Sequence, residues 1–257
     1  MNQIEKSPLQ KLDEIKPFKS SYSSEDFGEN KLGFIKEFFE PCLKNSVKYC
    51  RYSAFYNSEV LIYLFQGIKP LIKNGGKIKL LLGSIPDKDF DIANDEEKRK
   101  MYEEEFINNL FNEDEFPQES YKETKKALIQ LFAWLIDTKK LKIKLGFILN
   151  EKGMLANREE IAISLQKGML HDKVGIFLDK KDKKVGFRGS LNETIKGFFN
   201  HDEAIDVHKS WDIYPGKTEN EHLQGYIDKF NQLWKNKAKR LKAVSYTHLT
   251  LPTILLV

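Results

Sequence analysis

A strand–helix–strand pattern between residues 47 and 83 constrains the fold of this chain more than any other feature. It predicts a strand over Val47–Phe55, a helix over residues 60–71 and a strand over Lys77–Gly83. Asn74-Gly75-Gly76 separates the helix from the second strand, and a glycine there can adopt the positive φ that ends a helix. Two such strands are expected to be parallel and joined by a right-handed crossover. The chain is therefore predicted to adopt an α/β fold.

The rest of the chain continues this alternation around an inserted segment. Residues 87–138 carry two helical patterns and are predicted to form an inserted helical hairpin. Further strands are predicted over residues 141–145, 161–165, 171–178, 184–187 and 204–207, and further helices up to Pro41, over residues 191–199 and around residues 223–234. We expect a mixed central β-sheet with helices on both faces.

The two ends of the chain differ in composition from the predicted domain, which spans residues 30–243. Residues 1–29 are polar and are expected to form an arm with little fixed structure. Residues 244–257 contain no acidic or basic residue except one histidine and resemble translated sequencing-adapter sequence. This predicts a non-native tail and a natural protein that continues beyond Ala243. The alternative is a genuine apolar strand.

Composition limits the classes of function that the chain can have. The 257 residues are 40% hydrophobic, which is enough to bury a core, and the net charge of +4 permits nucleic acid as a partner without requiring it. Cys42 and Cys50 are predicted to be buried thiols, because two cysteines alone indicate neither a disulfide scaffold nor a zinc site. No signal peptide and no membrane-spanning apolar run is found, so we expect a cytoplasmic protein without a membrane partner.

Residues 169–207 contain the groups that metal-free cleavage of a phosphodiester needs. His171 and Lys173 are two residues apart on a predicted strand, so their side chains share one face. A neutral imidazole can attack phosphorus and hold it covalently, and a lysine can neutralise the non-bridging oxygens. A lone His-x-Lys pair is more often an ordinary surface pair, so its interpretation depends on the residues that come after it in the chain.

A Gly-Ser-x-Asn turn and an acid come after the histidine and lysine. Ser190 and Asn192, together with amides at the start of the next helix, can donate hydrogen bonds to a phosphate. Glu203 can accept a hydrogen bond from the second nitrogen of the histidine and so fix its tautomer. The candidate substrate-binding residues are Gly189, Thr194 and Asn200. Alone, these fragments indicate a capped turn and a solvated loop, but their order and spacing together favour a catalytic site.

This order of residues resembles the HKD motif of the phospholipase D superfamily. The residues that carry the resemblance are His171, Lys173, Gly189-Ser190-Leu191-Asn192 and Asn200–Glu203. Other segments resemble the N-terminal phospholipase D-like domain of bacterial DEAD/DEAH-box helicases of restriction and anti-phage systems; they are Pro41–Leu43, Arg51–Tyr56, Gly67-Ile68, Asn74–Ile78 and Ser210-Trp211. One departure is visible, because the family's aspartate usually falls where this chain has Leu178, and Asp179 comes one residue late. That acid is mainly structural in the family.

The resemblance implies a phospholipase D-like sandwich and a nuclease-type phosphodiesterase that acts on nucleic acid, DNA in particular. It implies a phosphohistidine intermediate, no cofactor and no metal ligand. The superfamily's active site uses two histidines, so a chain with one motif is expected to form a symmetric homodimer that pools two motifs. A helicase region is expected beyond Ala243.

Two alternatives remain open. The first is a non-catalytic DNA-binding or dimerisation module of a helicase. The second is a lipid phosphodiesterase, which predicts an apolar entry surface or a membrane-binding helix near the site.

Overall fold

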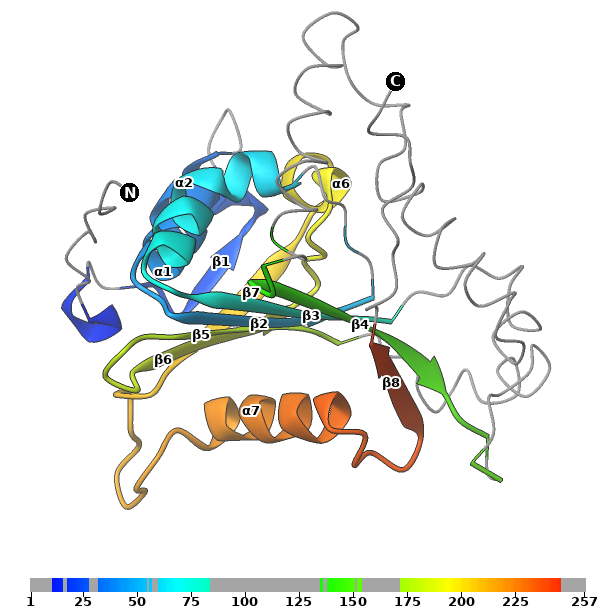
Figure 1. The fold of residues 1–257 in the computed structure, drawn as a ribbon. Coiled ribbons are helices and arrows are strands. Elements are labelled where there is room, and N and C mark those ends of the chain that lie inside the picture. Colours follow the sequence, from blue (N-terminus) through cyan, green and yellow to red (C-terminus); the bar gives the residue numbers. More distant parts are fainter. Residues whose placement is uncertain are drawn as a thin grey trace, which may run out of the picture.

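The computed structural model describes residues 11–15, 18–27, 32–54, 56, 60–83, 135, 138–150, 152–153 and 172–245. These residues form a mixed eight-stranded sheet with helices on both of its faces (Figure 1). The predicted fold class is thus confirmed. Most of the predicted helical insertion and the strand predicted over residues 161–165 lie outside the described residues.

Eight strands and seven helical segments make up the described part of the chain. The strands are β1 (Ser21–Ser23), β2 (Lys48–Ser53), β3 (Lys77–Leu82), β4 (Leu141–Ile148), β5 (Lys173–Leu178), β6 (Lys184–Gly189), β7 (Ala204–Lys209) and β8 (Leu241–Ser245). The helices are η1 (Leu12–Glu14), η2 (Ser24–Phe27), η3 (Ile35–Phe39), α1 (Glu40–Lys44), α2 (Val60–Lys73), α6 (Ile195–Phe199) and α7 (Glu221–Trp234). The order of strands across the sheet is β1-β7-β6-β5-β2-β3-β4-β8.

The strand–helix–strand unit forms as predicted. β2 and β3 are parallel neighbours joined by α2, and β4 continues the parallel part of the sheet beside β3. Gly75 has a φ of 81°, the left-handed conformation that ends α2. Leu80, Leu81 and Leu82 are all buried because the centre of the sheet is covered on both faces.

The second half of the chain adds antiparallel strands on one side of this unit. β5 pairs with β2 and β6, and β6 pairs with β7, each in antiparallel register. The turn between β5 and β6 was predicted from its polar residues, and Asp179 stabilises it. The Asp179 Oδ1 atom accepts hydrogen bonds from the backbone nitrogens of Lys181 (2.7 Å) and Lys183 (2.9 Å). This agrees with a structural role for the acid that comes after the lysine of the motif.

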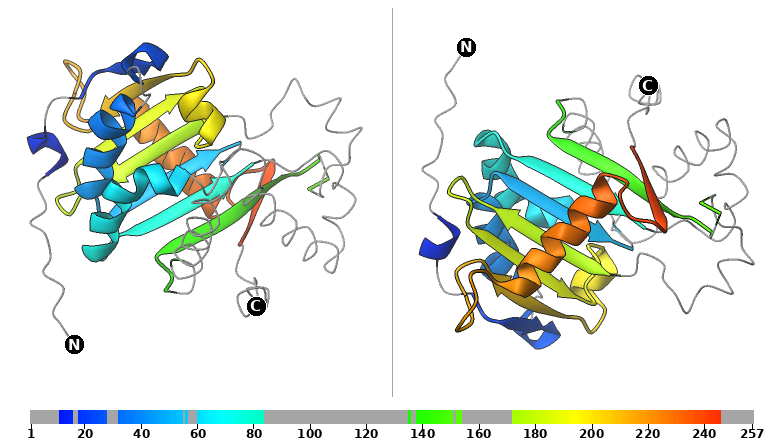
Figure 2. Two further views of the ribbon diagram at one scale, coloured as in Figure 1. Left: turned by 90° about the horizontal axis from the view of Figure 1, so that it is seen from above. Right: turned by 90° about the horizontal axis from the view of Figure 1, so that it is seen from below.

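The two faces of the sheet have separate apolar cores. One core packs η3, α1, α2 and α6 onto the sheet and contains Phe34, Phe38, Phe39, Phe177 and Phe187, whose rings meet mostly edge to face. The other core lies under α7, which crosses the strands diagonally (Figure 2). Cys42 and Cys50 are buried free thiols, as predicted. Among the helices that the structure describes, none is both long and apolar enough to span a membrane.

The N-terminal segment differs from its prediction. The expectation of little fixed structure is wrong for residues 18–27, because β1 pairs antiparallel with β7 at the sheet edge and buries Tyr22. The polar composition concealed this strand, since an edge strand is stabilised by its backbone pairing and needs few apolar side chains.

Two further boundaries differ. The helix predicted to end at Pro41 continues to Lys44, because Pro41 lies in the first turn of α1, where its missing N–H is tolerated. The helical pattern predicted to run up to Ala243 instead ends in strand β8, which pairs with β4. Residues 246–257 of the predicted tail lie outside the described residues.

Candidate active site

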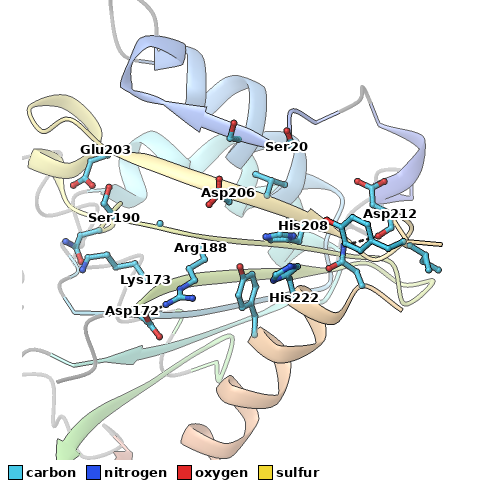
Figure 3. A pocket seen from close by; sticks show the side chains of 18 residues that line it. Ser20, Asp172, Lys173, Arg188, Ser190, Glu203, Asp206, His208, Asp212 and His222 are labelled. Carbon is cyan, nitrogen blue, oxygen red and sulfur yellow. Dashed lines mark hydrogen bonds and ion pairs between the residues drawn. The ribbon is translucent and has the colours of Figure 1, made fainter. Parts of the chain in front are cut away.

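An open cleft with a volume of about 1160 Å³ lies where β5, β6 and β7 approach the N-terminal half of α7 (Figure 3). The predicted site residues that line it are Lys173, Gly189, Ser190, Asn192 and Glu203. Thr194 and Asn200 do not line it, and His171 lies outside the described residues. The structure therefore brings together residues from β5, the turn after β6 and the start of β7.

Lys173 is a buried cation at one end of this cleft (Figure 3). It begins β5, pairs with Gly189 of β6 and is only 4% exposed. Burial lowers the pKa of Lys173, and the nearby Arg51 guanidinium lowers it further, whereas Glu203 and Asp172 act in the opposite direction. Lys173 puts a positive charge at this end of the cleft, which suits a phosphate oxygen.

Gly189 and Ser190 fix the close approach of β6 to β7. A Cβ atom at Gly189 would lie 1.9 Å from the carbonyl oxygen of Ala204 and 2.7 Å from the Cα atom of Ile205. Ser190 is bound to β7 by two hydrogen bonds. Its backbone nitrogen donates to Ala204 O (3.0 Å), and its Oγ atom accepts from Ala204 N (3.1 Å). The glycine of the motif is thus required by packing, and the serine hydroxyl is oriented by the backbone of β7.

Replacing Gly189 by alanine is expected to destabilise the fold by about 1–3 kcal/mol, because the added methyl group must displace backbone of β7. Gly225, on the exposed side of α7, is the matched control, since a Cβ there meets no atom within 4 Å. Gly225→Ala is expected to stabilise the protein by roughly 0.5–1 kcal/mol. Urea unfolding measures both changes, and a Gly189→Ala variant as stable as the wild type would refute the packing argument.

Asn192 and Glu203 are held in place by residues of distant segments. Ser53, at the end of β2, donates from Oγ to the Asn192 Oδ1 atom at 3.0 Å. The backbone nitrogen of Glu203 donates to Ser24 Oγ at 2.6 Å, so the N-terminal segment positions this acid. Glu203 is buried, and its Oε1 atom lies 3.6 Å from the Nδ1 atom of His201. The acid of the predicted site therefore has a described histidine beside it.

A buried charged network beneath the Gly-Ser-x-Asn turn was not predicted. Arg51 on β2 and Glu193 are 0% and 1% exposed, and the Arg51 Nε and Glu193 Oε1 atoms are 3.5 Å apart. Arg51 Nη2 donates to the carbonyl oxygen of Leu191 at 2.5 Å, and the Tyr49 hydroxyl donates to Glu193. Burial raises the pKa of Glu193, and the Arg51 guanidinium opposes this rise. The signal in the sequence was an arginine in the middle of a strand, between Cys50 and Tyr52.

The helix after the turn begins later than predicted. It was expected to start at the Gly-Ser turn and to offer its first amides to a ligand there, but α6 begins at Ile195. Thr194 is its N-cap, with its side chain accepting from Gly197 N at 3.0 Å, and Asn200 is its C-cap. Donors near Ser190 and Asn192 therefore come from the turn itself, and the described contacts of Thr194 and Asn200 are those of helix caps.

The cleft also contains groups that the motif did not indicate. Arg188 on β6 donates from Nη2 to Asp172 Oδ1 at 2.8 Å, and Lys229 on α7 contacts the other oxygen of that carboxylate. Farther from Lys173, His208 on β7 and His222 on α7 lie side by side (Figure 3). His222 and Lys229 lie on α7, outside the motif, so only the packing of α7 on the sheet brings them to it.

Known proteins resemble this chain in structure and not in sequence. Neither a protein-family model nor a curated protein matches the chain. Among solved structures, NucT from Helicobacter pylori is similar with 11% identity and a TM-score of 0.44, over 84% of this chain and 94% of that chain. Nuc from Salmonella typhimurium, a phospholipase D family member, is similar with 9% identity and a TM-score of 0.41, over 83% and 91% of the two chains.

A third similar structure is the phosphatidylserine synthase of Haemophilus influenzae Rd KW20. It has 14% identity and a TM-score of 0.41, over 84% of this chain and 38% of that chain. Structural similarity this low says nothing about the activity of this chain. Its function has to be inferred from its own residues.

Proposed function

We propose that this chain is a metal-independent phosphodiesterase domain that cleaves nucleic acid, DNA in particular, through a phosphohistidine intermediate. The observation that carries the proposal is the cleft in which Lys173, Ser190, Asn192 and Glu203 converge. A cation beside two neutral hydrogen-bonding side chains suits a phosphodiester, which has one negative charge and two non-bridging oxygens. The carboxylate of Glu203 is assigned to orient the attacking imidazole.

In the proposed reaction, the neutral imidazole of His171 attacks phosphorus and one ester oxygen leaves with the electron pair of its P–O bond. A protonated histidine supplies the proton that this oxygen needs. Water then displaces His171 from phosphorus and releases the product phosphate ester. The histidine that protonated the leaving oxygen takes the proton of this water. Lys173 neutralises the non-bridging oxygens. The Asn192 side chain is proposed to donate to them from its amide nitrogen, since an amide oxygen can only accept.

The second histidine is proposed to come from another copy of the chain. The sequence contains one His-x-Lys followed by Gly-Ser-x-Asn, and two such motifs are needed for one attacking and one protonating imidazole. A symmetric homodimer supplies both at its two-fold axis. The link to a helicase region beyond Ala243 belongs to the same proposal and has its support in the sequence resemblance.

Lys173→Met tests the proposal directly. In excess EDTA, we expect this variant to lose at least about 100-fold of the wild-type hydrolysis of bis(p-nitrophenyl) phosphate and of an oligonucleotide, because a charge-stabilising group is lost. Its melting temperature is not expected to fall, since the fold already disfavours the ammonium charge. Lys180→Met, in the exposed turn at the other end of β5, is the control.

Three outcomes would count against this function. Hydrolysis that requires magnesium would contradict the metal-independent scheme. Equal activity of Lys173→Met and the wild type would remove the cleft from the reaction. DNA binding by a wild-type protein that cleaves neither substrate would favour a non-catalytic DNA-binding module.

A further inference from the structure

The cleft extends well beyond the group of residues proposed to hold the phosphate. Lys173, Ser190 and Glu203 lie at one end, and His208, His222 and Asp212 lie toward the other, with Arg188 between them (Figure 3). The register pairs His208 with Gly186 of β6, four residues before Ser190, which comes directly after that strand. At about 3.3 Å per residue, the two ends are roughly 13 Å apart. A ligand larger than one phosphate group is needed to fill this length.

The far end is lined by flat rings. The centroids of the His208 and His222 rings are 4.8 Å apart with an angle of 27° between the planes, and Tyr226 meets His208 edge-on at 5.5 Å. Burial lowers the pKa of His208, and the neighbouring His222 lowers it further, so the His208 ring is kept neutral near pH 7. The two stacked rings offer a π surface for a flat ligand.

Two large apolar side chains are exposed at the same end. Ile213 is 47% and Tyr214 is 55% exposed, and they are the exposed large hydrophobic residues of the described part of the chain. Both line the cleft and directly follow Asp212, which lies toward the end that contains His208 and His222. Together with the stacked rings, they give this end of the cleft an apolar lining of the kind that ligand-binding grooves have.

The charges at this end select the part of a nucleotide that can bind there. Asp212 lies at this end and pairs with Lys209 at 2.8 Å, and Asp206 lines the middle of the cleft, level with Arg188 in the strand register. Carboxylates repel a phosphate but accept hydrogen bonds from the amino and imino groups of a base. An acyl chain of a lipid would gain nothing from them, whereas a base offers both a flat face for the rings and donors for the carboxylates.

We propose that Tyr214, His208, His222 and the two carboxylates form a nucleobase subsite that takes an unpaired nucleotide next to the cleaved phosphate. This inference rests on the proposed function and narrows its substrate to single-stranded nucleic acid. A base inside a duplex is stacked and paired, so it cannot reach the rings without leaving the helix.

Binding of single strands with and without bases tests the subsite. Fluorescence anisotropy is measured in EDTA with a labelled DNA oligonucleotide, with the same oligonucleotide made wholly of abasic residues, and with a duplex. We expect the wild type to bind the base-containing single strand at least about 10-fold more tightly than the abasic strand, because stacking on aromatic rings contributes to affinity. Tyr214→Ala is expected to lose most of this preference, and Tyr214→Phe to retain it.

The outcomes separate this inference from the proposed function. Equal binding of abasic and base-containing strands by the wild type, a preference unchanged in Tyr214→Ala, or tighter binding of the duplex would overturn the subsite. Hydrolysis of bis(p-nitrophenyl) phosphate by the wild type reports on the phosphodiesterase itself. If the wild type hydrolyses this substrate but shows no preference for base-containing strands, only the nucleobase subsite is wrong. If the wild type does not hydrolyse it, the proposed function is wrong, whichever oligonucleotide binds best.

Discussion

His171→Ala is expected to lose phosphodiester cleavage by at least about 10³-fold, because no other group can form the covalent bond to phosphorus in the proposed scheme. The variant should unfold at the temperature of the wild type, since the change removes a reacting group and leaves the sheet intact. Rates of oligonucleotide cleavage in EDTA and melting temperatures of the two proteins measure this.

His201 provides the control for that assignment. Its Nδ1 atom lies 3.6 Å from Glu203 Oε1, so it is the described histidine nearest to the acid that we assign to His171. Because its side chain is 57% exposed, His201→Ala is expected to keep its stability and most of its activity. If His201→Ala abolishes cleavage and His171→Ala does not, the attacking imidazole has been assigned to the wrong residue.

Glu193→Ala is expected to destabilise the protein by about 3–5 kcal/mol, because it leaves the guanidinium of Arg51 buried without its counter-ion. Domains of this kind have a total stability of roughly 5–15 kcal/mol, so the loss should be evident as a large fall in the urea midpoint. A change below about 1 kcal/mol would show that the buried pair does not behave as a coupled unit.

A double variant separates stability from positioning. Replacing both members, as Arg51→Met with Glu193→Leu, removes the buried charges together and is expected to recover much of the stability that Glu193→Ala loses. Cleavage should not recover, because Arg51 also holds the carbonyl oxygen of Leu191 next to Asn192. Recovery of both stability and cleavage would show that the network supports the fold but does not position the turn.

The local parts of the fold and site could be predicted because their signals are local. The Leu80–Leu82 run and the glycines after α2 indicated a parallel unit with a covered centre, and the structure has it. The Gly-Ser-x-Asn turn likewise comes directly after a predicted hairpin strand. Lys173, Ser190 and Glu203 line one cleft because adjacent strands of the sheet bring their ends together.

The remaining features depend on contacts between distant segments, which spacing along the chain does not report. β1 forms only because the edge of β7 offers it backbone partners, and Ser24 next to it then holds Glu203. The pairing of Arg51 with Glu193 joins residues that are far apart in sequence. The stacked imidazoles of His208 and His222 meet only after α7 has packed across the sheet.

The start of α6 shows a different limit. Several polar residues after Gly189 could each cap a helix, and propensity alone does not choose between them. The structure selects Thr194 as the N-cap, four residues later than Ser190, so the proposed phosphate donors belong to a turn instead of a helix end.

Trapping the covalent intermediate tests the central claim most directly. The protein is mixed in EDTA with an oligonucleotide that has ³²P at every internal phosphate, quenched within the first turnovers and separated under denaturing conditions. The account predicts label on the wild-type chain, stable to alkali and lost in acid as expected for a phosphorus–nitrogen bond, and no label on His171→Ala. Cleavage that proceeds without label on the wild-type chain, or that leaves label on His171→Ala, would contradict it.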